Sequence, residues 1–284
     1  MSYRDTRDAP HVLRTRDLTA AGWRHRDLRA AVAQGRLVRA RRGVYLPPDT
    51  DADCLAAAEL RGRLACVSEL RRRGVFVLEP AARHFHVAPD AARLPASAAG
   101  DRVHRERLLR MPHPRSISVE VLDAVRQAVR CQPPRAAIAT IDSALHLGVL
   151  PHHDLAELFE SLPRRFRRLR RLLDSRSESG PETFLRLILR SIGCRVEIQV
   201  LIGDVGRVDF LVDGWLIIEC DSEAHHSSWL EQKRDRRRDQ RSAALGYATY
   251  RPIAEDILWH ADRVRAAITG LLAGRAARRR PAAR

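Results

Sequence analysis

The chain has 284 residues, of which 45% are hydrophobic and 30% are charged, and its formal net charge is +16. This balance excludes a wholly disordered chain, and the length allows two or three domains. No apolar run is long enough to cross a membrane and the first residues lack the apolar core of a secretion signal, so we expect a cytoplasmic protein with no membrane partner.

The distribution of charge is more informative than its sum. Lys233 is the only lysine and the other 50 basic residues are arginine, which is typical of a coding bias and weakens arginine content as evidence for a polyanionic partner. Residues 1–50 carry 11 basic and 5 acidic residues, whereas residues 201–250 carry 7 basic and 9 acidic residues. Acids therefore gather in one part of a basic chain, as expected where carboxylates bind a cation.

The five cysteines are widely scattered and include no C-x-x-C pair. They are Cys54, Cys66, Cys131, Cys194 and Cys220. This spacing indicates neither a disulfide framework nor a cysteine zinc site, and we expect reduced thiols that are mostly buried.

The N-terminal segment predicts two short helices followed by a β-hairpin. Helices are expected over residues 17–21 and 26–34, each followed by a glycine, and strands over residues 37–38 and 44–46 around an Arg-Gly turn. In the second helix, Leu28 and Ala31 fall on one apolar face. This order of elements is that of a winged helix-turn-helix DNA-binding domain.

Six arginines of this segment would then meet DNA, at the start of the second helix and in the wing. They are Arg24, Arg26, Arg29, Arg39, Arg41 and Arg42. The alternative is an ordinary small helical domain whose arginines are only solvated. The stretch AAGWRHRDLRAAVAQGRLVRARRGVYLPP resembles the N-terminal winged-helix domain of AbiEi-type antitoxins, the DNA-binding half of type IV toxin–antitoxin systems, and this resemblance implies DNA binding.

The middle of the chain predicts mixed structure and then helices. A helix is expected over residues 52–73, short strands over 75–78, 84–87 and about 103–109, and helices over much of 119–173. Because no carboxylate or cysteine stands at ligand spacing, we expect surface histidines and no metal site at His84, His86, His104 and His113. The basic run RRFRRLRRLL is either the solvated face of a helix or a contact with a duplex backbone.

A change of character near residue 175 marks the main predicted boundary. Beyond it the pattern predicts a helix, three strands, a polar helix, a fourth strand and a last helix, over residues 181–193, 196–202, 206–212, 215–221, 228–245, 247–251 and 254–272. This is the core order of restriction-endonuclease-like nucleases. We therefore expect a multidomain α+β and α/β protein, with a winged helix-turn-helix at 1–50, a connecting domain at 51–174, a nuclease domain at 175–273 and a basic disordered tail at 274–284.

Two acids of this segment are placed to hold a cation. Asp209 lies in the second strand and Glu219 at the end of the third, and an odd-numbered loop of residues 212–214, with Gly214 left-handed, would put both carboxylates on one face of the sheet. Phosphodiester cleavage needs a hard cation that polarises the phosphate and activates a water, and such cations bind carboxylates. We therefore expect Asp209 and Glu219 to bind Mg²⁺ or Mn²⁺.

Further residues complete the predicted nuclease site. Glu182 on the first helix would order a metal-bound water, and His225 or His226 would act as a base or as a phosphate donor. The polar helix offers three cations for phosphates, Lys233, Arg234 and Arg238.

Residues 178–272 resemble the restriction-endonuclease-like domain family of unknown function that is related to very-short-patch-repair endonucleases. The resemblance rests on ESGPETFLRLIL, the glutamine of IQV, RVDF, IIECDSEAHH, RDRRRD and LGYATYRPIAEDIL in this order. It implies a DNA-cleaving site with the metal pair Asp209 and Glu219 and with Glu182, Asp221, His225, Arg234, Asp235, Arg238 and Arg251. Asp221 and Ser222 depart from the lysine and glycine usual there; Asp221 could be a third metal oxygen, and Lys233 could supply the missing positive charge.

Three functions stay open on the sequence alone. The first is a Mg²⁺-dependent DNA endonuclease or nickase, guided by a winged helix, in repair, restriction or defence. The second is an antitoxin-like DNA-binding regulator in which the nuclease-like domain is inert, and the third is an RNA-binding protein that uses the same basic surface. We expect no small-molecule substrate, and nothing in the sequence indicates the oligomeric state.

Overall fold

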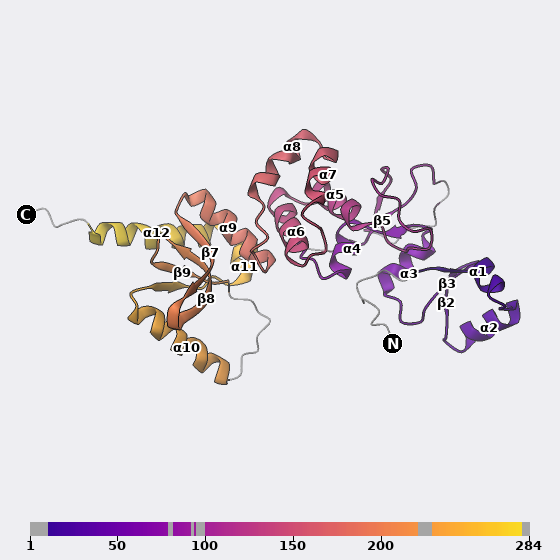
Figure 1. Ribbon diagram of the computed structural model, residues 1–284, viewed down its shortest axis with the longest axis horizontal. Coiled ribbons are helices and arrows are strands. Elements are labelled where there is room, and N and C mark those ends of the chain that lie inside the picture. The colour runs from indigo at the N-terminus through magenta and orange to yellow at the C-terminus, as the bar shows by residue number, and fades with distance from the viewer. Residues whose placement is uncertain (1–10, 79–81, 92–93, 95–99, 221–228, 280–284) are drawn as a thin grey trace, which may run out of the picture. The chain divides into compact units, whose positions relative to one another are not determined.

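The computed structural model describes residues 11–78, 82–91, 94, 100–220 and 229–279 (Figure 1). The chain divides into two compact units, residues 1–170 and 171–284, and each is described by itself. The units contain helices and three small sheets, which agrees with a multidomain α+β protein. The residue limits of the four predicted domains stay predictions.

The first unit begins with two helices and a three-stranded antiparallel sheet of order β1-β3-β2. Its elements are β1 (Leu13–Arg14), α1 (Thr15–Ala20), α2 (His25–Ala33), β2 (Val38–Arg41) and β3 (Val44–Leu46). The Asp27 carboxylate accepts a hydrogen bond from the Arg24 backbone N–H at 2.9 Å and so caps the start of α2. Leu28 and Ala31 are buried together with Leu37 and Tyr45. The two predicted helices, the predicted hairpin and the predicted apolar face are therefore present.

The rest of the first unit combines a small mixed sheet with helices. Its elements are α3 (Ala52–Glu59), β4 (Arg63–Leu64), α4 (Cys66–Arg72), β5 (His84–His86), β6 (Arg102–His104), α5 (Val121–Cys131), α6 (Pro134–His146), α7 (Asp154–Ser161) and α8 (Arg164–Arg167), followed by a 3₁₀ turn, η1 (Arg168–Leu172). Strand β5 lies between β4, to which it is antiparallel, and β6, to which it is parallel. The predicted helical character of residues 119–173 is present.

Two predicted elements of secondary structure in the middle of the chain are absent from the residues that the structure describes. The helix expected over 52–73 is broken into α3 and α4, because Arg61 adopts a left-handed φ of 62° and the chain turns at Gly62 to pair β4 with β5. Gly62 lies so close to this crossing that a Cβ atom there would be 2.8 Å from the carbonyl oxygen of His86. Residues 75–78 form no strand: the backbone N–H of Phe76 donates instead to the Ser143 hydroxyl of α6 at 2.9 Å.

The second unit is a four-stranded mixed sheet with helices. Its elements are α9 (Gly180–Ile192), β7 (Val196–Ile202), a 3₁₀ turn η2 (Gly203–Val205), β8 (Gly206–Val212), β9 (Leu216–Ile218), α10 (Trp229–Ala244), β10 (Ala248–Tyr250), α11 (Ala254–Trp259) and α12 (Ala261–Arg279). The strand order is β10-β9-β8-β7, with β10 parallel to β9 and the other pairs antiparallel. The predicted order of elements is present, except that the last helix is two helices separated at His260 and that α12 continues to Arg279, into residues predicted to be a disordered tail.

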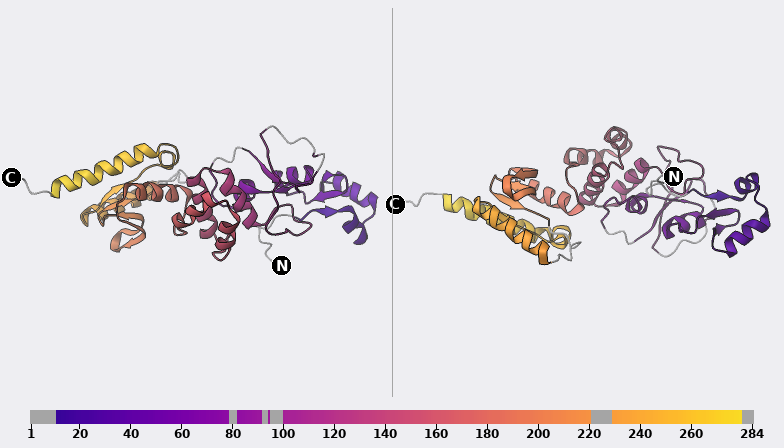
Figure 2. Two further views of the ribbon diagram at one scale, coloured as in Figure 1. Left: turned by 90° about the horizontal axis from the view of Figure 1, so that it is seen from above. Right: turned by 60° about the horizontal axis from the view of Figure 1, so that its bottom comes forward.

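Both faces of this sheet are covered. Phe210 and Ile218 are fully buried on one face, and Leu211 and Ile217 are buried in a cluster on the other. In Figure 1, α9 lies above the strands and α10 below them, and α9 also contacts α11 and α12. Helix α12, yellow in both views of Figure 2, runs as one straight helix toward the C-terminus. The central strands are apolar because both of their faces are in the core.

Candidate functional site

The β8–β9 hairpin places the two predicted metal ligands on one face of the sheet. Phe210 pairs with Ile218 and Val212 with Leu216, so that the next opposed positions in this register are Asp209 and Glu219. The loop therefore spans residues 213–215, one residue later than predicted, but its odd length is as predicted. Gly214 is left-handed as expected, with φ 72°, and Asp213 precedes it with φ 49°.

Asp209 is a half-buried carboxylate with polar neighbours on both oxygens. Its Oδ2 accepts a hydrogen bond from the Cys220 backbone N–H at 2.9 Å, and its Oδ1 accepts a long one from the Gln199 Nε2 at 3.5 Å. Burial is the main influence on this group and raises its pKa above the ordinary value, although both hydrogen bonds act in the opposite direction. Asp209 is thus an incompletely compensated charge inside the second unit.

Gln199 joins Asp209 to Glu182. It interrupts the β7–β8 pairing between Ile198 and Val200. Its φ of 54° is left-handed, which is rare for residues other than glycine, asparagine and aspartate. Its Nε2 donates to the Glu182 Oε2 at 3.1 Å, while its Oε1 is buried with no hydrogen-bond partner within the described residues. A buried amide oxygen without a donor is a vacant acceptor beside two carboxylates.

Glu182 has a structural role as well as a place in this cluster. It stands at the third position of α9, where its backbone N–H donates to the hydroxyl of the N-cap Ser179 at 3.3 Å and its Oε2 accepts from the Glu178 backbone N–H at 2.8 Å. Burial raises the pKa of Glu182, and the negative charge of Asp209 adds to this increase. The side chain thus caps the helix and faces the cluster at the same time.

Glu219 is bound by two arginines. Its Oε1 lies 2.6 Å from the Arg238 guanidinium, and its Oε2 lies 2.8 Å from the guanidinium of Arg251. Arg238 also donates to the carbonyl oxygens of Val205 and Arg207, and Arg251 also pairs with Asp239 at 2.8 Å. These two arginines, predicted to contact phosphates, are thus the ion-pair partners of Glu219. Burial nevertheless raises the pKa of Glu219.

The carboxylates satisfy part of what a divalent cation needs. The Asp209 carboxylate offers oxygen atoms in a partly buried place, and the Oε1 of Gln199, whose Nε2 contacts Asp209, is a buried oxygen without a donor within the described residues. Within the ranges that the structure describes, however, Glu182, Asp209 and Glu219 do not form a compact group of three ligand atoms. The residues therefore fit a hard cation at Asp209, and Glu219 joins it only if its arginines release it. Two further predicted residues, Asp221 and His225, lie outside the described residues.

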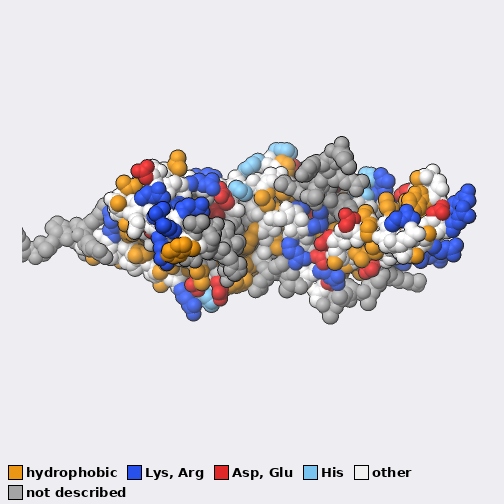
Figure 3. Space-filling view, turned by 90° about the horizontal axis from the view of Figure 1, so that it is seen from below, with side chains coloured by type: hydrophobic (Ala, Val, Ile, Leu, Met, Phe, Trp, Pro, Cys, Tyr) orange, Lys and Arg blue, Asp and Glu red, His pale blue; other side chains and the backbone are white. Residues whose placement is uncertain are grey.

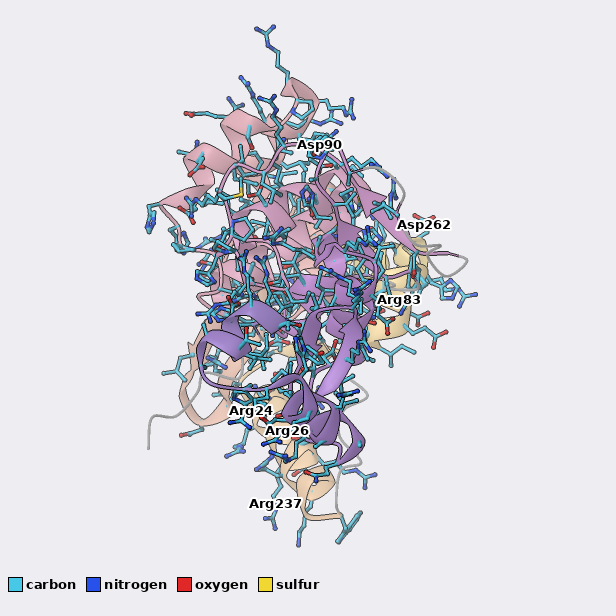
Figure 4. The ribbon with its side chains drawn as sticks, turned by 90° about the vertical axis from the view of Figure 1, so that its right-hand side faces the viewer. Arg24, Arg26, Arg83, Asp90, Arg237 and Asp262 are labelled. Atoms are coloured by element: carbon cyan, nitrogen blue, oxygen red, sulfur yellow. The ribbon has the colours of Figure 1, made fainter. Side chains whose placement is uncertain are left out.

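Helix α10 carries an exposed basic surface on its outer side. Lys233, Arg234, Arg237 and Arg241 are exposed and line an open hollow of about 650 Å³, whereas Arg238 and Ser242 face inward. Arg237 is labelled in Figure 4, and Figure 3 shows basic side chains on this part of the second unit. Lys233 lies on the outer side, and none of its described contacts reaches the carboxylates.

A second basic surface lies at the start of the chain, where all six predicted arginines are exposed: Arg24, Arg26, Arg29, Arg39, Arg41 and Arg42. Figure 4 shows Arg24 and Arg26 projecting outward near the start of α2. Arg41 is partly engaged, since its Nε donates to the carbonyl oxygen of Ala58 at 3.0 Å and burial lowers its pKa. No carboxylate in the described ranges pairs with Arg29, Arg39 or Arg42.

Two arginines that the sequence did not single out, Arg14 and Arg16, belong to this surface. They line an open hollow of about 390 Å³ together with Arg41 and Arg42 of the hairpin. Arg14 is brought there because β1 pairs with β3, in the register Arg14 with Val44. Pairing between strands that are distant in sequence is not visible in a local pattern, so the sequence alone did not reveal this contribution.

Comparison with known proteins gives a match for this N-terminal segment. The family model described as a transcriptional regulator, AbiEi antitoxin, matches residues 7–48, which include α1, α2 and the β2–β3 hairpin. No curated protein matches the chain. Among the described helices, none combines the length and the apolar character that crossing a membrane requires.

Proposed function

We propose that the chain binds duplex DNA through α2 and the β2–β3 hairpin, which act together as a winged helix-turn-helix, and that it is a DNA-binding regulator. The observation that carries this proposal is the coincidence of the AbiEi match at residues 7–48 with a cluster of exposed arginines on the same elements. The net charge of +16 is consistent with a polyanionic partner.

In this proposal the arginines have two roles. Leu28 and Ala31 fix the inner side of α2, so Arg26 and Arg29 stand on its solvent side and Arg24 at its start. The start of a recognition helix is where side chains reach base edges, and an arginine there can donate two hydrogen bonds to guanine. Hairpin arginines such as Arg42 are placed to neutralise phosphates.

The test compares two triple variants of the full chain that lose the same charge. The first is Arg24→Ala/Arg26→Ala/Arg29→Ala, and the second is Arg107→Ala/Arg130→Ala/Arg135→Ala, whose arginines are exposed in the same unit and lie on or beside α5 and α6. A preferred duplex is selected from random sequences with the parent protein, and binding is then measured by fluorescence anisotropy over a range of salt concentrations.

The proposal predicts different losses for the two variants. The α2 variant should bind the selected duplex at least about tenfold more weakly and should lose most of its preference for that duplex over unselected sequences, because its arginines are proposed to reach base edges. The control should remain within about twofold of the parent, because charges beyond a Debye length are screened. Equal losses of duplex affinity in both variants would show that net charge alone drives binding and would contradict the proposal. Tighter binding to a structured RNA competitor than to the duplex would favour the RNA alternative.

A second candidate function, metal-dependent DNA cleavage, is favoured by the cluster around Asp209. Three features support it: Asp209 and Glu219 share a sheet face, the buried carboxylates are incompletely compensated, and Gln199 Oε1 is a vacant acceptor. Asp209 and Glu219 would hold Mg²⁺ or Mn²⁺, which when bound would polarise a phosphate and acidify a water. Gln199 would orient Asp209 through the hydrogen bond that it already donates, and the α10 cations would hold the substrate backbone.

The cleavage test uses supercoiled plasmid with Mg²⁺ or Mn²⁺. Nicking or linearisation by the parent chain should be lost in Asp209→Asn and Glu219→Gln and retained in Glu197→Gln, a control whose carboxylate is exposed on β7 and pairs with Arg195. Asp209→Asn should leave duplex affinity nearly unchanged, since it alters neither the arginines of α2 and the hairpin nor the cations of α10. Cleavage by Asp209→Asn at the parental rate would refute the candidate, and repression of its own promoter without any nicking would favour an inert nuclease-like domain.

A further inference from the structure

Four side chains that are distant in sequence meet inside the first unit. They are Cys66, the first residue of α4; His84 on β5; His104 on β6; and Cys131, the last residue of α5. One ligand atom of each lies within 4.8 Å of all the others, and within the described residues this is the one group of this kind. The expectation of surface histidines is thus wrong here, since His84 is 7% exposed and His104 is 8% exposed.

Two distances within this group are close to those of a tetrahedral metal site, and the remaining ones do not exceed 4.8 Å. The Nδ1 of His84 lies 3.2 Å from the Nε2 of His104, which in turn lies 3.9 Å from the Cys131 sulfur. Around a tetrahedral zinc with bonds of about 2.1 Å to nitrogen and about 2.3 Å to sulfur, neighbouring ligand atoms are separated by roughly 3.3–3.8 Å. The side chains therefore need only small shifts to coordinate one ion.

The surroundings orient His104 for coordination. Its Nε2 faces the group, while its Nδ1 lies 3.8 Å from the Glu106 carboxylate. A carboxylate on that side favours the proton on Nδ1 and leaves the Nε2 lone pair toward the group, an arrangement that is common for zinc-bound histidines. His86, two residues after His84 and equally buried, does not belong to the group.

The backbone at Cys66 is held in an unfavourable conformation. The φ of Cys66 is 51°, a left-handed value that residues other than glycine rarely adopt. The backbone N–H of Cys66 donates to the Gln127 Oε1 at 3.1 Å. The sheet that carries the two histidines is small, with strands of two, three and three residues. A bound ion would connect α4 and α5 to this sheet. It would thereby stabilise a region whose strands are too short to be stable alone.

We propose that Cys66, His84, His104 and Cys131 bind one Zn²⁺ ion that stabilises the first unit. Two thiolates and two imidazoles are a donor set that selects zinc, and four protein ligands close the coordination sphere. No position is left for a substrate or an activated water, so the site is structural. It is separate from the carboxylate cluster and does not depend on either proposed activity.

The first test measures the metal in the parent chain, purified without any metal-affinity step. Elemental analysis should find one zinc per chain, and a mercurial reagent that captures thiols should release it. Chain refolded with Co²⁺ should show the visible bands of a tetrahedral ion and a thiolate-to-cobalt charge-transfer band. Folded parent chain that lacks zinc and does not bind Co²⁺ would overturn the proposal.

Matched variants then assign the ligands. Cys66→Ser and His104→Asn should lose zinc and the cobalt bands, whereas Cys54→Ser and His86→Asn, which alter equally buried residues outside the group, should retain both. If a ligand variant does not fold, the parent chain still decides the question. Non-reducing peptide mapping that finds Cys66 and Cys131 in one disulfide-linked peptide pair would show a disulfide in place of the ion and would overturn the proposal.

Discussion

The ion pairs of Glu219 give a stability prediction that can be worked from the structure. Replacing Glu219 by Gln removes the charge shared by Arg238 and Arg251, whose side chains are 24% and 28% exposed, against 13% for Glu219. Arg251 keeps its ion pair with Asp239, and the burial that raises the pKa of Glu219 offsets part of the attraction, so the main loss is the counter-charge of Arg238. Discounting for the exposed fractions, this loss is about 2 kcal/mol. For a unit of residues 171–284 this corresponds to a fall of roughly 10 °C in its unfolding temperature.

The matched control is Glu178→Gln. Glu178 pairs with Arg207 at 2.8 Å, but the two side chains are 38% and 58% exposed, so the expected loss is no more than about 0.5 kcal/mol. Differential scanning calorimetry of the full chain would follow both variants, and the transition that Glu219→Gln shifts is assigned to the second unit, since a chain of two compact units need not unfold in one two-state step. A difference of no more than ~2 °C between the unfolding temperatures of the two variants would refute the reasoning.

Two other substitutions test how burial and close approach act in each unit. Because burial raises the pKa of Asp209, its stabilising contribution is complete below its ordinary value of 3.8 and is lost as pH rises through the folded pKa. The unfolding temperature of Asp209→Asn should therefore rise relative to that of the parent as pH increases from about 4 to 7. A constant difference between the two across this range would contradict the raised pKa of Asp209. Gly62→Ala should destabilise the first unit by about 1–3 kcal/mol, because the new Cβ atom would lie 2.8 Å from the His86 carbonyl oxygen. Gly203→Ala, at a position with open space around it, should change the unfolding temperature little. Equal shifts of the unfolding temperature in calorimetry would argue against the contact at Gly62.

Local patterns predicted most helices and strands of this chain. The apolar face of α2 and the span of α9, expected over residues 181–193 and observed over Gly180–Ile192, are properties of contiguous residues, so they are readable without the fold. The helix expected over 52–73 failed because its apolar spacing continues through residues 59–66, while the turn there is imposed by the pairing of β4 with β5.

The candidate sites show the same limit. The shared face of Asp209 and Glu219 follows from strand alternation and an odd loop, which the sequence supplies. The engagement of Glu219 by Arg238 and Arg251 depends on where α10 and β10 pack, which no spacing reveals. Cys66 and Cys131 are far apart in the chain and in no metal-ligand motif, and only the packing of four elements brings them to His84 and His104.

Hydrogen–deuterium exchange on the full chain, with and without saturating duplex DNA, tests the central claim most directly. Our account predicts that DNA slows exchange in peptides that cover residues 24–46, where α2 and the β2–β3 hairpin carry the exposed arginines. Slower exchange confined to other parts of the chain, with residues 24–46 unchanged, would contradict it.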